Sequence, residues 1–155
     1  MLTINQRKTV SSGPRIPRQR TEGTALVRRS WVVSPNLTGP RQARYIARQQ
    51  LAEWRLHEHA DTAELLVSEL VTNAITHGEG PITLSLRSQH GRLRCEVTDS
   101  YADLPQLRPT SPDCESGRGM QLVDMLARRW GVRCSEHHKT VWFELATCTA
   151  QERCL

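Results

Sequence analysis

The 155-residue sequence lacks long apolar runs, and only 5% of its residues are aromatic. No stretch approaches the roughly 18 to 20 apolar residues of a membrane-spanning helix, and residues 1–22 lack the apolar centre of a secretory signal. The five cysteines form no Cys-x-x-Cys pair and are odd in number, which disfavours a zinc site and a complete disulfide framework. We therefore expect a soluble, cytoplasmic protein with reduced thiols, of which Cys95 lies in the core.

Positive charge is concentrated at the N-terminus. The net charge is +5, and five basic residues against one acidic residue fall within the first 24 positions. Apolar residues show no period of 2 or 3.6 there, so we predict a disordered basic tail over residues 1–24. A basic arm can contact phosphates without sequence preference, but a solubilising tail has the same composition, and we do not expect nucleic-acid binding.

One domain of mixed helices and strands follows the tail. Apolar periodicity predicts five strands and three helices. The strands are expected over about 25–33, 82–87, 93–99, 132–136 and 140–145, and the helices over about 38–56, 61–77 and 117–130. This order predicts an α/β (α+β) two-layer sandwich over residues 25–146, with helices on one face of a mostly antiparallel sheet. Residues 147–155 are expected to form a C-terminal tail.

Local signals refine these elements. Asp61, with Glu64 three residues later, is typical of a capping box at the start of the second helix. Gly131 is expected to end the third helix. Trp130 and Trp142 fall on apolar faces, and both are expected to be core residues.

A polar face on the second predicted helix is the strongest candidate for chemistry. Glu69, Asn73 and His77 recur at i, i+4 and i+8, so they share one helical face. A carboxylate one turn before an amide could orient a hydroxyl beside a hard metal ion. The alternative is that these side chains are only solvated helix positions. His77, beside the helix-ending Gly78, suits a partner of the helix dipole better than a catalyst.

Two further segments point to the same site. Asp99 ends a predicted strand, and a long segment rich in Pro, Asp and Ser follows it at 100–116. Gly117 and Gly119 then open the third helix, where free backbone amides and the helix dipole favour a phosphate. Together these features indicate a nucleotide with its metal ion.

These segments resemble the histidine-kinase-like (GHKL) ATP-binding domain, which has the Bergerat fold. More narrowly, they resemble the stand-alone anti-sigma-factor serine/threonine kinases. The resemblance covers about residues 31–145. The segment from Glu69 to Gly78 is similar to the family's N-box, the segment from Ser116 to Met120 to its second glycine box, and Lys139-Thr140-Val141-Trp142 to its closing motif.

The resemblance implies a role for each matched residue. Glu69 would be the general base, Asn73 would bind Mg²⁺ through its amide oxygen, and Asp99 would accept a hydrogen bond from the adenine amino group of ATP. The other implied nucleotide-binding residues are Gly117, Arg118, Gly119 and Thr140. The segment 100–116 would be the nucleotide lid.

One position departs from the family pattern, because Tyr101 stands where a glycine is usual. Two hypotheses therefore remain. The first is an ATP-dependent serine/threonine protein kinase that phosphorylates an anti-sigma-factor antagonist and otherwise sequesters a sigma factor. The second is a non-catalytic protein-binding regulator with a degenerate or structural nucleotide site. Both require a protein partner, and the resemblance also implies a homodimer.

Overall fold

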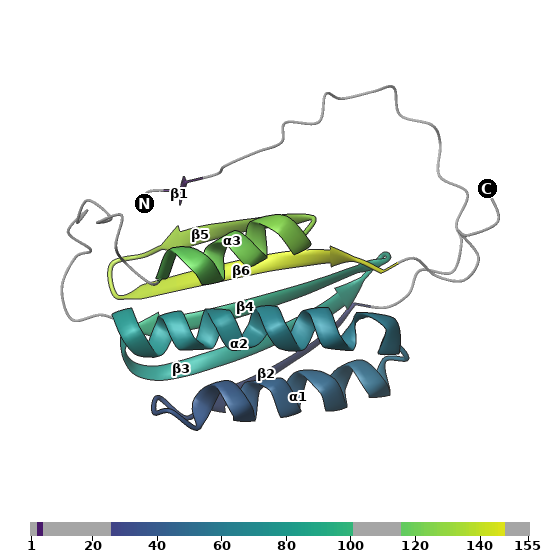
Figure 1. The fold of residues 1–155 in the computed structure, drawn as a ribbon, viewed down its shortest axis with the longest axis horizontal. Helices are drawn as coiled ribbons and strands as arrows, with labels where there is room; N and C mark the ends of the chain where they lie inside the picture. The colour runs from purple at the N-terminus through teal and green to yellow at the C-terminus, as the bar shows by residue number, and fades with distance from the viewer. Residues whose placement is uncertain (1–2, 5–25, 101–115, 148–155) are drawn as a thin grey trace.

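A computed structural model of the chain describes residues 3–4, 26–100 and 116–147 (Figure 1). In chain order the helices and strands are β1 (Thr3–Ile4), β2 (Val27–Val33), α1 (Gly39–Glu53), the short 3₁₀ helix η1 (His57–His59), α2 (Ala60–His77), β3 (Glu79–Gln89), β4 (Arg92–Ser100), α3 (Ser116–Leu126), β5 (Arg129–Cys134) and β6 (His138–Ala146).

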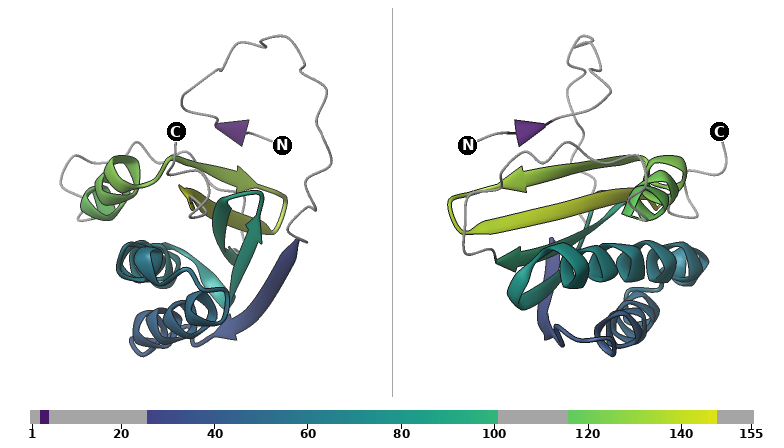
Figure 2. Two further views of the ribbon diagram at one scale, coloured as in Figure 1. Left: turned by 90° about the vertical axis from the view of Figure 1, so that its right-hand side faces the viewer. Right: turned by 60° about the vertical axis from the view of Figure 1, so that its left-hand side comes forward.

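The strands form one sheet in the order β1-β5-β6-β4-β3-β2, and every neighbouring pair is antiparallel. The three α-helices lie on one face of this sheet, as the side view in Figure 2 shows. This is the two-layer α/β sandwich that the element order predicts. Its opposite face, here called the open face, carries no helix of the described part of the chain.

The core lies between the sheet and the helices. Alternate residues of each strand point to the helices, and those of β3 and β4, such as Leu84, Leu86 and Cys95, are fully buried. A two-residue turn joins these strands, since His90 and Gly91 both have positive φ, 49° and 68°. Burial raises the pKa of the Cys95 thiol, which therefore stays protonated. The prediction of a core position for Cys95 is confirmed.

The capping box predicted at Asp61 is wrong. α2 begins at Ala60, and its N-cap residue His59 makes no side-chain capping bond. Asp61 and Glu64 instead accept hydrogen bonds from the Arg48 guanidinium of α1. The two acidic residues therefore join helices α1 and α2 rather than cap one of them.

The third helix is shorter than predicted. α3 ends at Leu126, and Trp130 and Gly131 lie within β5. Met125 and Leu126, which continue the apolar pattern in the sequence, are 77% and 44% exposed. Gly131 is needed for close packing rather than for ending a helix, because a Cβ atom at this position would lie 2.8 Å from the Trp142 ring.

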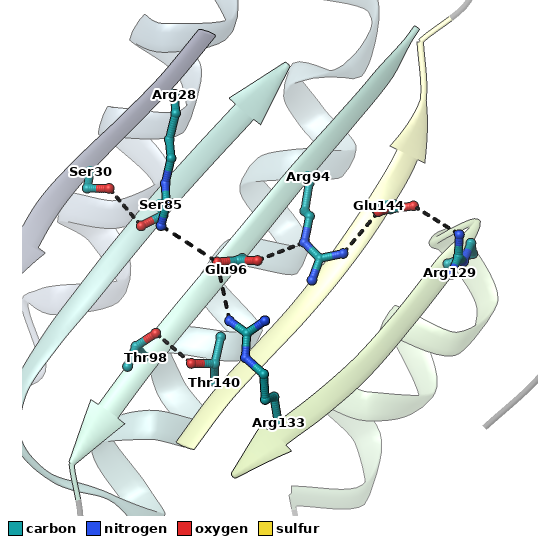
Figure 3. Close-up of polar contacts among 10 residues, drawn as sticks. All are labelled: Arg28, Ser30, Ser85, Arg94, Glu96, Thr98, Arg129, Arg133, Thr140 and Glu144. Atoms are coloured by element: carbon teal, nitrogen blue, oxygen red, sulfur yellow. Dashed lines mark hydrogen bonds and ion pairs between the residues drawn. The ribbon is translucent and has the colours of Figure 1, made fainter. Parts of the chain in front are cut away.

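Trp142 is not a core residue between sheet and helices. Its partner on β4 is Glu96, and both lie on the open face with Arg94, whose guanidinium stands 3.9 Å from the centre of the Trp142 ring. Arg94 also donates hydrogen bonds to Glu96 (2.7 Å) and Glu144 (3.1 Å), as Figure 3 shows. The open face is thus a polar surface built around one arginine.

The N-terminal segment departs from the prediction at one point. Thr3–Ile4 form β1, which pairs with Arg133 and Val132 of β5. The rest of the predicted N-terminal tail lies outside the described residues, as do the predicted lid over 101–115 and residues 148–155. Within the described part of the chain, no helix combines the length and apolarity needed to span a membrane.

Candidate functional site

α2 is the central element of the site. Its apolar side is buried through Leu66, Leu70 and Ala74, and Glu69 and Asn73 lie along the edge of this buried side. Both side chains are half-buried, and neither forms a hydrogen bond with another residue of the described segments. The carboxylate and the amide therefore remain available to a ligand.

The first turn of α3 lies directly against Glu69. A Cβ atom on residue 119 would lie 2.6 Å from Oε2 of Glu69, so only glycine leaves the carboxylate in place. Gly117 belongs to the same turn of α3. Backbone amides of a first helical turn favour an anion. The Arg118 side chain lies outside the described part of the structure, and its phosphate contact stays a prediction.

Asp99 lies at the C-terminal end of α2, beside Gly78. A Cβ atom on Gly78 would lie 2.7 Å from Cγ of Asp99, so the missing side chain makes room for the carboxyl group. Asp99 is only 2% exposed. Its Oδ1 is buried without a hydrogen-bond partner, and its Oδ2 lies 3.8 Å from Nζ of Lys139.

Burial raises the pKa of Asp99 above its ordinary value, although the positive charges of Lys139, His77 and His138 oppose the rise. A buried carboxyl oxygen without a partner is costly in a folded protein, and such groups concentrate at functional sites. The arrangement suits an acceptor that waits for a donor on a ligand.

These two places along α2 are the two ends of a site that fits a nucleotide. Glu69 and His77 are eight residues apart on α2, a rise of about 12 Å. One end offers helix-terminal amides for phosphates beside Gly119, and the other offers the unsatisfied Asp99 oxygen for a base. An extended nucleoside triphosphate has a comparable length, so the residues present fit the group that the sequence implies.

Thr140 is not brought together with Asp99. Its side chain points to the open face, where its hydroxyl lies 2.8 Å from that of Thr98 (Figure 3). The helix-facing position opposite Asp99 is occupied by Lys139. Sequence reasoning missed this lysine, although the alternation of Val141, Phe143 and Leu145 places residue 139 on the same strand face.

The metal assignment rests on Asn73 alone. Within the described ranges, no group of three His, Cys, Asp or Glu side chains could hold a metal ion. This finding is compatible with a magnesium ion whose other ligands are phosphate oxygens and water. When bound, such an ion neutralises phosphate charge. Binding of Mg²⁺ by Asn73 stays a prediction.

Comparison with known proteins agrees with the fold. The family model of the histidine kinase-like ATPase domain matches residues 33–145, which include the three α-helices, strands β3 to β5 and all of β6 except its last residue. A comparison with curated proteins finds no match. Because the matched region covers most of the chain and contains the whole candidate site, the protein belongs to the histidine kinase-like ATPase family and carries its ATP-binding domain.

Proposed function

We propose that the protein is an ATP-dependent serine/threonine protein kinase, with an anti-sigma-factor antagonist as its substrate and a sigma factor as its second partner. The observation that carries the proposal is the position of Glu69, whose carboxylate lies against Gly119 in the first turn of α3. A carboxylate beside a phosphate-binding helix terminus is where an attacking hydroxyl would need a base.

In this proposal each residue has one task. Glu69 accepts the proton of a serine or threonine hydroxyl on the partner protein. The hydroxyl oxygen bonds to the terminal phosphorus of ATP, and ADP leaves with the electrons of the broken phosphorus–oxygen bond. Asn73, one turn further along α2, holds Mg²⁺. The amides of the first turn of α3 hold phosphate oxygens, and Asp99 accepts a hydrogen bond from the base.

The test separates binding from transfer. Glu69→Gln keeps the shape of the side chain but removes the base, so ATP affinity should stay within a few-fold of wild type. Phosphate transfer to a candidate antagonist should fall by about 10² to 10⁴. Binding is measured by calorimetry with Mg-ATP, and transfer by labelled phosphate on the antagonist.

Asp61→Asn is the matched control, because Asp61 lies on the same helix with its side chain 94% exposed and away from Gly119. This control should leave both readouts unchanged. If wild-type protein binds ATP but Glu69→Gln transfers phosphate as fast as wild type, Glu69 is not the base. Binding of ATP without transfer to any antagonist would instead favour a non-catalytic, nucleotide-holding regulator.

A further inference from the structure

Lys139 forms a pair with Asp99, and the proposed chemistry gives this lysine no task. They are directly opposite residues on β6 and β4, and both side chains point to the helix side of the sheet. Lys139 is 25% exposed and Asp99 is 2% exposed. At 3.8 Å, Nζ of Lys139 is too far from Oδ2 of Asp99 for a good hydrogen bond. The ammonium group therefore keeps its donors for another acceptor.

The pair presents two different groups side by side. Oδ1 of Asp99 is a buried acceptor without a partner, and Nζ of Lys139 is a donor 3.8 Å from the other carboxyl oxygen, Oδ2. Among the described residues, the positive charge of Lys139 lowers the pKa of Asp99 more than those of His77 and His138 do. A ligand that uses both groups must carry a donor and an acceptor next to each other.

The edges of purine bases carry a donor beside an acceptor, but adenine and guanine have the two groups in opposite positions. Adenine offers the 6-amino donor beside the N1 acceptor, whereas guanine offers the O6 acceptor beside the N1–H and 2-amino donors. A carboxylate alone suits the adenine amino group and repels the guanine O6. A carboxylate with an adjacent ammonium group satisfies guanine as well, because Asp99 can accept from N1–H while Lys139 donates to O6.

We propose that Lys139 sets the base selectivity of the nucleotide site and makes it accept 6-oxopurine nucleotides such as GTP alongside ATP. This inference rests on the nucleotide site of the proposed function and adds its selectivity. Lys139 is a specificity-determining residue in this proposal, and the transfer step at Glu69 does not depend on it.

The experiment compares affinities for ATP, GTP and ITP, measured by displacement of a fluorescent nucleotide in the presence of Mg²⁺. Wild-type protein should bind GTP and ITP within about tenfold of ATP. Lys139→Met removes the donor for O6, so GTP and ITP should weaken by at least about tenfold more than ATP. Lys139→Arg keeps a donor and should keep the wild-type preference.

Arg92→Gln is the control, because it removes one positive charge from an exposed position of β4 on the open face. It should leave the ratio of GTP to ATP affinity unchanged. Thermal unfolding confirms that each variant is folded; should Lys139→Met not fold, the wild-type affinities and Lys139→Arg still decide the question.

Two results overturn the inference while leaving the proposed function intact. One is wild-type protein that binds ATP more than a hundredfold more tightly than GTP and ITP. The other is Lys139→Met that weakens all three nucleotides equally, which is the result expected if Lys139 only balances the charge of Asp99. Absence of binding by any of the three nucleotides overturns the proposed function as well, so the two failures are distinguishable.

Discussion

Asp99 is the residue at which the fold and the site conflict. Its carboxyl group is buried, Oδ1 has no hydrogen-bond partner among the described residues, and Oδ2 meets only a distant ammonium group. Removal from water disfavours the charged carboxylate more than Lys139, His77 and His138 favour it, so the pKa is raised. An ionised Asp99 therefore lowers the stability of the free protein.

The sign of the pH dependence follows from this shift. A carboxyl whose pKa is higher in the folded than in the unfolded chain binds its proton more tightly when folded. Its favourable contribution is present below the unfolded pKa and is lost as the pH rises through the folded pKa. Asp99→Asn cannot ionise, so its stability relative to wild type should increase between about pH 4 and pH 7.

Urea unfolding of both proteins across this range measures the difference directly. The carbon-13 shift of the labelled Asp99 carboxyl group gives the titration independently of stability. A constant difference between the two proteins would contradict the prediction. Asp99→Asn should also bind ATP more weakly. A carboxylate has two acceptor oxygens, whereas the amide of asparagine has one acceptor and one donor, and the donor cannot accept the hydrogen bond from the base.

Most residues of the candidate site could be named from the sequence, but Lys139 could not. Glu69 and Asn73 could be found because both lie on one helix, where sequence spacing fixes the shared face. For Asp99 the sequence predicted a place at the end of a strand, but not its contact with Gly78. Lys139 was missed because its relation to Asp99 depends on the register of β4 against β6, two strands that are far apart in sequence.

At the scale of elements, β4 contributes residues to the candidate site on one face of the sheet and to the charged network on the other. Its helix-facing residues supply core and Asp99, and its open-face residues Arg94 and Glu96 form the centre of a charged network with Glu144 of β6 (Figure 3). The side chains of Arg94, Glu96 and Glu144 are only 16%, 17% and 9% exposed. Removing Arg94 would take from two poorly hydrated carboxylates the side chain that donates hydrogen bonds to them.

Arg94→Met should therefore destabilise the fold by about 3 kcal/mol, measured by urea unfolding at pH 7. Arg28→Gln is the matched control, since the Arg28 side chain is 58% exposed and 4.0 Å from Glu96; it should cost within about 0.5 kcal/mol. Combining Arg94→Met with Glu96→Gln and Glu144→Gln should recover much of the loss, because no carboxylate is then left with only distant arginines as partners. Equal losses for Arg94→Met and Arg28→Gln would contradict a central role for Arg94.

The helix predicted for Trp130 and the core position predicted for Trp142 are both wrong, and both errors belong to this scale. Trp130 continues a helical apolar pattern in the sequence, yet the chain leaves α3 after Leu126 and Trp130 packs against the core from β5. Trp142 alternates correctly as a strand residue, but its face is covered by Arg94, which is 48 positions away in the sequence. Local periodicity predicts a strand or a helix, whereas the neighbour that covers a side chain is set by sheet pairing.

At the scale of the whole molecule, the net charge does not show where the basic residues lie. Removal of residues 1–24 eliminates five basic residues and one acidic residue, so the net charge falls from +5 to +1. The described open face nevertheless carries six arginines against Glu96 and Glu144. These arginines are Arg28, Arg87, Arg92, Arg94, Arg129 and Arg133. The fold thus places many positive charges on the open face, while acidic residues elsewhere in the chain keep the net charge small.

Retention on a polyanion column at low salt distinguishes the tail from this face. If net charge alone governs retention, the protein lacking residues 1–24 should pass through the column. We expect it to be retained and to elute at lower salt than the full chain, because clustered guanidinium groups attract a polyanion even when the total charge is small. Adding Arg28→Gln, Arg87→Gln and Arg92→Gln, all on the open face, should abolish the remaining retention. Persistence of retention in that variant would place the basic surface elsewhere on the molecule.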